Sequence, residues 1–309
     1  MSQAQAGGAW SGALVIDKPL GLTSFDVVAR VRRIYGEKRV GHAGTLDPLA
    51  TGVLPLCLGP ATRLIEFLAD AGKEYEAEIR LGTTSATYDG EGPVQIQIAD
   101  PADLPDRAAV ATALEAFRGP LQQLPPMHSA VQQGGKRLYE LARQGVEVER
   151  APRAVVIYRL DLLEYDAPLL RVRVECSKGT YVRSLAHDLG AALGCGAYLA
   201  GLRRTRHGPF RLTDAVTLDA LAEAAAEGRL GDLLLPADTL VADWPRIDVD
   251  EAGALRVAQG RPLAQPPPAP DGPRRLRVYE PPGRLLALAY WDAEQALWHP
   301  AKVFLQRSE

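Results

Sequence analysis

The sequence predicts an α+β fold built on a mixed or antiparallel sheet, and two patterns carry this prediction. Residues 75–81 and 170–176 alternate strictly between apolar and polar side chains, which is typical of half-buried strands. Apolar stripes at helical spacing occur at about 107–117, 136–144 and 182–193. Strands and helices therefore mix without the regular repeat of a doubly wound sheet.

Near the N-terminus, a short buried strand is expected over 13–16, followed by a turn rich in proline and glycine. Thr23 or Ser24 can then cap a helix whose apolar positions recur as far as Gly36, a residue suited to ending it. A second helix is expected over about 60–69. These elements flank the turn-rich loop on which the functional argument depends.

The chain has 309 residues, enough for one large domain and one small one. An acidic helix is expected over 217–227, and we place the domain boundary after it, near Trp244. The prediction is a large domain over 11–243 and a small domain over 244–309. Residues 1–10 are mostly small and polar and are expected to form a disordered extension.

The small domain is expected to be rich in β-structure. An apolar-polar helix over 251–259 precedes a proline-rich loop over 262–273. Three runs typical of strands then follow, at 276–279, 285–291 and 301–305. Some sixty residues with this pattern predict a compact β module.

The composition is that of an ordinary soluble globular protein, with 47% apolar and 24% charged residues. No segment reaches the roughly 18 consecutive apolar residues needed to cross a membrane. Cys57, Cys176 and Cys195 are far apart and form no CxxC pair, so neither a disulfide framework nor a zinc site is indicated. We expect a cytoplasmic protein without a structural metal.

The net charge of −3 counts weakly against nucleic acid as a partner. Residues 214–243 hold seven acidic residues and one basic residue, so the rest of the chain is net positive. Local patches rather than total charge set the field that a phosphate meets. Basic side chains cluster at three places: Arg30, Arg32, Arg33, Lys38 and Arg39; Arg203, Arg204 and Arg206; and Arg274, Arg275 and Arg277. For any single cluster we favour a solvated face of one element, so the three clusters are compatible with RNA binding without establishing it.

The stretch 41–62 is the most informative part of the chain. Four glycines and three prolines break it into turns, and Asp47 is its one formally charged side chain at neutral pH. A lone carboxylate in such an apolar loop is poorly solvated. Asp47 either caps a helix, since Pro48 suits a first helical position, or takes part in chemistry. The two interpretations are compatible, because a cap position fixes the direction of a carboxylate.

Residues 41–55, Gly-His-Ala-Gly-Thr-Leu-Asp-Pro-Leu-Ala-Thr-Gly-Val-Leu-Pro, resemble the catalytic motif of TruB-type tRNA pseudouridine synthases. Further segments follow in that family's order: Asp17-Lys18-Pro19 with Gly21-Leu22-Thr23-Ser24, Lys73-Glu74-Tyr75, Arg137-Leu138-Tyr139-Glu140, and Ser177-Lys178-Gly179-Thr180-Tyr181-Val182-Arg183. Together these motifs cover residues 12–210. Several independent motifs in register make the resemblance specific.

The resemblance implies that the chain isomerises uridine to pseudouridine at position 55 in the T loop of tRNA. This reaction breaks the bond between C1′ and N1, turns the detached uracil, and joins C5 to C1′, with neither a cofactor nor a metal. The target base must first be flipped out of its stack. The implied catalytic residue is Asp47, either as nucleophile or as the base that removes a sugar proton, and the sequence leaves both routes open.

The same resemblance implies four substrate-binding residues. Arg183 matches the ion-pair partner of the aspartate, Tyr75 matches a ring placed against the target base, and Leu202 matches an apolar wall of the pocket. His42 matches a residue that fills the space left by the flipped nucleotide. From the residues alone, Arg183 is expected to be a surface arginine on the first turn of a helix, which the resemblance reverses, and Tyr75 an ordinary core aromatic.

The implied partner is the T stem-loop of tRNA, with no membrane, no obligate protein partner and a monomeric state. The position and pattern of 244–309 resemble the PUA-type RNA-binding domain that follows the catalytic domain in this family. The chain departs from the family pattern at His128, where an aromatic residue is usual, and at Arg63, where lysine is more common.

Two alternatives stay open. One is a synthase of the same superfamily that acts on another RNA or with a guide RNA, although the segment 137–145 and the C-terminal module favour the stand-alone bacterial type. The other is an RNA-binding protein that assists tRNA folding without catalysis. Phosphate-binding loops and dinucleotide motifs are absent from the sequence, and no second acid for a two-carboxylate hydrolase is obvious near Asp47.

Overall fold

The computed structural model describes residues 5–6, 9–69, 71–129, 131–133, 135–146, 148–263 and 274–304. The chain divides into two compact units, Met1–Leu235 and Pro236–Glu309. This division comes before the predicted boundary at 243/244. The reason is that Asp238 accepts a hydrogen bond from Tyr279 and lies 3.9 Å from Arg277, so it belongs with the C-terminal strands. No helix of the described residues is long and apolar enough to span a membrane.

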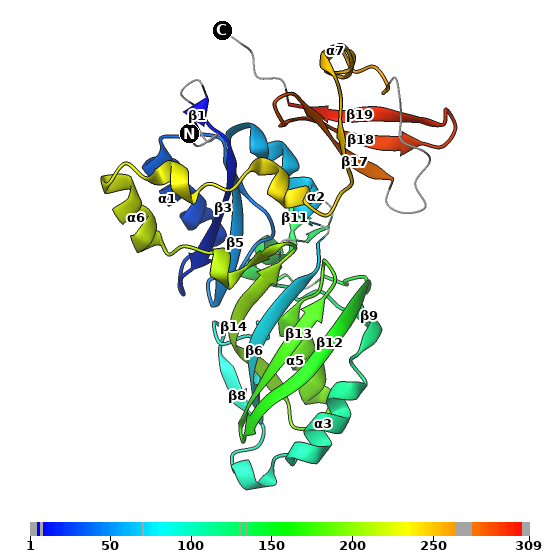
Figure 1. Ribbon diagram of the computed structural model, residues 1–309. Coiled ribbons are helices and arrows are strands. Elements are labelled where there is room, and N and C mark those ends of the chain that lie inside the picture. The colour runs from blue at the N-terminus through cyan, green and yellow to red at the C-terminus, as the bar shows by residue number, and fades with distance from the viewer. Residues whose placement is uncertain are drawn as a thin grey trace. The chain divides into compact units, whose positions relative to one another are not determined.

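The first unit is built on a nine-stranded sheet (Figure 1). Its main path runs β3 (Gly12–Lys18), β5 (Ala50–Leu58), β14 (Ala197–His207), β6 (Lys73–Leu81), β13 (Leu169–Cys176), β12 (Arg153–Asp166) and β9 (Gly119–Gln123). β4 (Val40–His42) also pairs with β5, and β15 (Phe210–Arg211) pairs with β14. β5 and β14 pair in parallel, whereas the other strand pairs described in this sheet are antiparallel. The predicted α+β class with a mixed sheet is confirmed.

The helices of this unit are α1 (Ser24–Tyr35), α2 (Ile65–Ala69), α3 (Arg107–Glu115), α4 (Leu138–Arg143), α5 (Val182–Ala192) and α6 (Leu218–Ala226). Short two-stranded pairings join β1 (Gln5–Ala6) to β2 (Ala9–Trp10), β7 (Thr83–Ser85) to β8 (Val94–Ile96), and β10 (Gln132–Gln133) to β11 (Lys136–Arg137). Helix α5 packs against β14 and α3 against β12, and the two helices contact each other. These two helices therefore cover part of the sheet, and α5 is the helix that carries Arg183.

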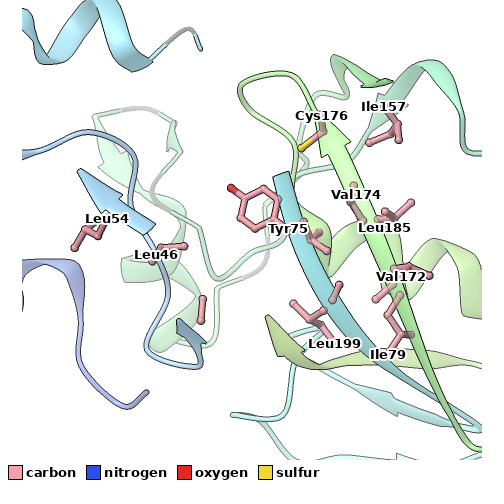
Figure 2. Close-up of a cluster of buried hydrophobic side chains, with 14 of the residues drawn as sticks. Leu46, Leu54, Tyr75, Ile79, Ile157, Val172, Val174, Cys176, Leu185 and Leu199 are labelled. Carbon is pink, nitrogen blue, oxygen red and sulfur yellow. The ribbon is translucent and has the colours of Figure 1, made fainter. Parts of the chain in front are cut away.

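The alternating patterns do form the predicted strands. Along β6, buried side chains from Tyr75 to Leu81 alternate with more exposed ones, and β13 repeats this alternation. Figure 2 shows the resulting core, in which Val172 and Val174 of β13 face Leu185 of α5. Burial of one face of each strand stabilises the sheet and fixes its register.

Helix α1 begins and ends where the sequence predicts. Thr23 and Asp26 form a reciprocal capping box, and Gly36 closes the helix in the left-handed region with φ 63°. The helix expected at 60–69 is only partly present: residues 59–64 form a 3₁₀ helix with a proline as its second residue, and α2 follows. The helix expected at 136–144 starts later, because residues 136–137 pair as β11.

The second unit contains a four-stranded sheet in the order β16 (Arg246–Asp248), β17 (Arg275–Glu280), β18 (Arg284–Asp292) and β19 (Leu297–Val303), with α7 (Glu251–Ala258) packed on it. Its core includes Val257, Val278 and Trp298. Strand β19 starts before the run predicted at 301–305, and Leu305 lies outside the described residues, as do residues 264–273 of the proline-rich loop. The extension predicted at 1–10 falls partly outside them, and β1 and β2 pair within it.

Candidate active site

A cavity of about 310 Å³ opens in the first unit beside the parallel pair β5–β14. The loop 44–47, the start of β6, the segment 178–183 and the middle of β14 supply most of its wall. Four of the five predicted site residues line this cavity, although they lie far apart in the sequence: Asp47, Tyr75, Arg183 and Leu202. Ala50, Lys73, Ser129 and Arg204 also line it.

The loop that carries Asp47 is tied down on both sides. The Ser24 hydroxyl accepts a hydrogen bond from the backbone N–H of Leu46 at 2.9 Å and donates one to its carbonyl at 3.1 Å. The ammonium of Lys18, which is fully buried, donates to the carbonyls of Leu22 at 2.5 Å and Pro48 at 3.4 Å. The Lys-Pro and Thr-Ser motifs thus hold the loop, which gives a physical reason for their place beside the catalytic motif.

The helix-cap interpretation of Asp47 is wrong. A turn follows Asp47, and the chain enters β5 at Ala50, whose N–H bonds to the Asp47 carbonyl at 3.0 Å. No helix among the described residues begins there. The carboxylate therefore has no helix N-terminus to satisfy, which leaves the chemical interpretation.

Arg183 stands on the first turn of α5, with its side chain buried. Its Nη2 lies 2.9 Å from Oδ2 of Asp47 and donates to the His128 carbonyl at 2.8 Å. The ion pair expected for Arg183 and Asp47 is confirmed, and the surface interpretation of Arg183 is wrong. His128 contributes to the site through its backbone, so this contact does not require the aromatic side chain usual at that position.

A second carboxylate, which the sequence reasoning missed, holds the other side of Arg183. Oδ2 of Asp89 is 3.1 Å from Nη1 of Arg183, and the Asp89 side chain is 1% exposed. Its Oδ1 accepts hydrogen bonds from the Thr87 hydroxyl at 2.6 Å and the Glu91 N–H at 3.0 Å. The sequence signal is an acid in a turn before Gly90, which does not reveal its partner. The guanidinium is thereby fixed between two carboxylates.

The segment before Asp89 is held against α5. Tyr88 has a left-handed backbone with φ 64°, which is uncommon for a residue other than glycine. Its ring stacks on His187 at 3.9 Å between centroids. Because His187 is one helical turn beyond Arg183, this stack places Asp89 beside the guanidinium. The strained residue thus stands next to a functional contact.

The surroundings of Asp47 oppose its ionisation. Burial raises the pKa of its carboxyl above the usual value, the positive charge of Arg183 partly offsets this, and the negative charge of Asp89 adds to it. The side chain is nevertheless 40% exposed to the cavity. Asp47 is therefore accessible, weakly solvated and held in one direction, as a nucleophile or base needs to be.

Tyr75 and Leu202 belong to the apolar part of the wall. Leu202 on β14 is the register partner of both Ala50 on β5 and Ala77 on β6. Figure 2 shows the hydroxyl of Tyr75 pointing away from the β13 core, toward the side where Leu46 lies. Burial raises the pKa of the phenol. The planar ring of Tyr75, which has one polar end, thus lines the cavity.

Buried basic residues also belong to this wall. Arg204 on β14 is the register partner of Tyr75 on β6, and it is 0% exposed. Lys73 is also buried, and the pKa of the buried His207 is lowered to about 2, first by burial and then by the charges of Arg204 and Lys73. Gly44 is required here, since its φ is 74° and a Cβ would lie 2.9 Å from Cε1 of His207.

His42 is not among the described residues that line the cavity. It ends β4 and pairs with Leu56 of β5, and its Nδ1 is buried without a hydrogen-bond partner. Burial lowers the pKa of its ring. The described residues also contain no group of three or more His, Cys, Asp or Glu side chains placed to hold a metal ion.

Comparisons with known proteins show the family to which the chain belongs. Residues 32–182 match the model of the TruB family pseudouridylate synthase N-terminal domain, and residues 183–242 match that of the tRNA pseudouridylate synthase B C-terminal domain. The sheet of the first unit is therefore that of a pseudouridylate synthase.

Similar curated proteins narrow the class. The chain is 48% identical over 297 residues to the tRNA pseudouridine synthase B of Dehalococcoides mccartyi strain BAV1, covering 96% of this chain and 97% of the relative. It is 50% identical over 287 residues to that of Aromatoleum aromaticum, covering 93% and 90%. Among solved structures, the archaeal box H/ACA sRNP Nop10–Cbf5 complex holds a chain with TM-score 0.73 and 28% identity, covering 96% of this chain and 87% of that one. The chain belongs to the TruB family.

Proposed function

We propose that this chain isomerises uridine to pseudouridine at position 55 in the T loop of tRNA. The observation that carries the proposal is the exposed carboxylate of Asp47, held by the buried Arg183 in the wall of a cavity. Relatives of nearly half identical sequence are named tRNA pseudouridine synthase B, and they match over almost the whole chain. The site and the relatives thus support the same reaction.

The proposed catalytic residue is Asp47. Its carboxylate either attacks C1′ of the flipped nucleotide or removes a proton from the sugar, and its place at the cavity suits both roles. Arg183 fixes the direction of the carboxylate through the 2.9 Å contact. Held on its other side by Asp89, the guanidinium cannot follow the carboxylate if the latter moves.

Three further residues are proposed to bind the substrate. Tyr75 would stack its ring on the target base, and Leu202 would close the pocket from β14. His42 would fill the space left in the RNA by the flipped nucleotide, from its place at the end of β4, outside the cavity wall. Its ring is held neutral at physiological pH because burial lowers its pKa, which suits stacking rather than proton transfer.

We further propose that the enzyme works as a monomer in the cytoplasm and without a guide RNA. The tRNA pseudouridine synthase B of Aromatoleum aromaticum is 50% identical to this chain, whereas the chain of the archaeal Nop10–Cbf5 complex is 28% identical. The cytoplasm is where tRNA is modified in bacteria, and the free, buried thiols of Cys57, Cys176 and Cys195 are compatible with it.

The C-terminal unit is proposed to be a PUA-like module that contributes to RNA binding. Its sheet carries Arg246, Arg275 and Arg277 next to Trp244 and Tyr279. Arginine and aromatic side chains together bind phosphates and unpaired bases. Arg246 and Arg277 already face carboxylates, so this module is expected to strengthen tRNA binding rather than to provide all of it.

The test is incubation of the purified protein with an unmodified tRNA transcript, followed by site-resolved mapping of pseudouridine. We expect one new pseudouridine at position 55, and none with Asp47→Asn. A transcript with cytidine at position 55 is the matched control and should yield no product. Product at another uridine of the wild-type transcript would contradict the assigned position.

The same experiment separates catalysis from assistance with tRNA folding. An enzyme should lose product formation but keep tRNA binding when Asp47 becomes asparagine. A protein that only binds and refolds tRNA should make no pseudouridine as wild type, yet should still hold the transcript tightly. That second result would overturn the proposed function.

A further inference from the structure

The isomerisation moves one negative charge across the cavity, whichever route it takes. If Asp47 attacks C1′, the carboxylate becomes a neutral ester and the electron pair of the C1′–N1 bond leaves with the uracil. If Asp47 removes a sugar proton, it becomes a neutral acid and the same electron pair leaves with the uracil. In both routes the charge of Asp47 disappears and the detached uracil becomes an anion. The following inference rests on the proposed function of this site.

The Asp47 side of the cavity stays electrically balanced after this transfer. Arg183 is bridged to Asp47 at 2.9 Å and to Asp89 at 3.1 Å. When Asp47 becomes neutral, Asp89 still compensates the guanidinium. Arg183 therefore does not become an unpaired buried cation, and it is not needed as the counter-ion of the uracil.

The uracil side needs a cation of its own, because an uncompensated anion in a poorly solvated site is costly. Arg204 lines the same cavity and is 0% exposed. Its Nε donates to the Val53 carbonyl at 2.7 Å and its Nη2 to the Gly44 carbonyl at 3.1 Å. No carboxylate of the described residues forms an ion pair with it, and its Nη1 lacks a hydrogen-bond partner. A buried arginine without an anion is unusual.

We propose that Arg204 is the counter-cation of the detached uracil, and that it acts through the phenol of Tyr75. Arg204 and Tyr75 are direct register partners on β14 and β6, so their side chains share one face of the sheet. The guanidinium has no exposed surface, and Tyr75 stands in the cavity wall with it. Arg204 is thus a positioning residue, which polarises the phenol toward the ring that carries the new charge.

The neighbourhood of Arg204 keeps this positive potential in place. Its charge acts on Tyr75, lowering the phenol pKa against the larger effect of burial. It also helps to keep His207 neutral, so that ring does not add a competing charge. Gly52 of β5, with φ 98°, packs directly against the backbone of Arg204. A Cβ at position 52 would clash with the Arg204 carbonyl oxygen, so only glycine allows this close packing. The arginine is held rigidly, as a preorganised charge must be.

The test varies the stability of the leaving anion. Fluorine at C5 makes the uracil anion intrinsically more stable, so cleavage of 5-fluorouridine depends less on help from the protein. Single-turnover loss of N-linked nucleoside is measured for tRNA carrying uridine or 5-fluorouridine at position 55, in wild type, Arg204→Met, Arg204→Gln and Arg204→Lys. Arg171→Gln, a half-exposed arginine on β13, is the matched control for loss of a charge.

We expect Arg204→Met and Arg204→Gln to slow cleavage of uridine about 100-fold, the usual effect of losing one group that stabilises a developing anion. Cleavage of 5-fluorouridine should slow less, so the ratio of the two rates rises severalfold. Arg204→Lys retains the charge and should keep the wild-type ratio, and so should Arg171→Gln. The tRNA dissociation constant should change less than threefold in all of them.

An equal slowing of both substrates in a folded Arg204→Gln protein would overturn the proposal and make Arg204 a structural residue. Folding of each variant is checked by circular dichroism and Tm. If Arg204→Met fails to fold, the proposal is tested by comparing the ratio of the 5-fluorouridine and uridine cleavage rates in Arg204→Gln and Arg204→Lys. A wild-type protein that makes no pseudouridine would instead overturn the proposed function, which keeps the two failures distinct.

Discussion

Substitution of Arg183 by lysine keeps the positive charge but removes the geometry that the site depends on. The two terminal nitrogens of Arg183 reach separate partners: Nη2 contacts Asp47 at 2.9 Å and the His128 carbonyl at 2.8 Å, and Nη1 contacts Asp89 at 3.1 Å and the Thr87 carbonyl at 3.4 Å. A lysine has one nitrogen and cannot hold both carboxylates in their present places. It must give up one side of the bridge.

The loss can be estimated from these contacts. Two charge-assisted hydrogen bonds disappear, each contributing roughly 1.5–3 kcal/mol, so at least about 3 kcal/mol of the arrangement around Asp47 is lost. Since each 1.4 kcal/mol is about tenfold in rate, we expect kcat of Arg183→Lys to fall about 100-fold or more. Affinity for tRNA should change less than threefold, because Arg183 is 5% exposed and its contacts lie within the protein.

The assay measures single-turnover pseudouridine formation and, separately, the tRNA dissociation constant by filter binding. Arg171→Lys is the matched control, since Arg171 also links two carboxylates, Glu76 and Glu164, but is 49% exposed. Exposed ion pairs contribute about 0–1 kcal/mol, so this variant should behave as wild type. Equal losses of rate and affinity in Arg183→Lys would refute the reasoning, because they would mean that Arg183 contacts the RNA directly.

Three further predictions follow from the same site and from the division of the chain. The proposed role of Asp47 requires an ionised carboxylate, and its pKa is raised, so kcat should fall as the pH drops through a value above the pKa of an ordinary aspartate. Asp89→Asn removes a negative charge that contributes to this rise, so the acidic limb of the pH profile should move to lower pH. Asp47→Asn should abolish turnover without lowering Tm at pH 7, because a carboxylate whose pKa is raised by folding destabilises the native state when ionised, and Arg183 retains Asp89; a clear drop in Tm would contradict this. A chain ending at Leu235 should stay folded and bind tRNA more weakly, yet form some pseudouridine at high RNA concentration; a folded but wholly inactive fragment would count against a separate catalytic unit.

Local sequence patterns were sufficient for most elements near the site. The alternation over 75–81 predicted β6, and the capping residues and glycine predicted the limits of α1, because burial periodicity and capping act within a few residues. The patterns failed at 59–64, where a short segment with a proline in its first turn forms a 3₁₀ helix instead of an α-helix. They also failed at Asp47, where a proline suited to a helix start instead entered a turn before β5.

The sequence by itself determined the α+β class and the motifs in register, and it singled out Asp47 as the proposed chemical group, because these depend on residue types and short spacings. Only the tertiary structure decided what surrounds that group. Asp89 joins Arg183 across 94 positions, and Arg204 lies beside Tyr75 through the pairing of β14 with β6. No local pattern records such partners, since their burial and charge balance arise only when distant strands pair and exclude water.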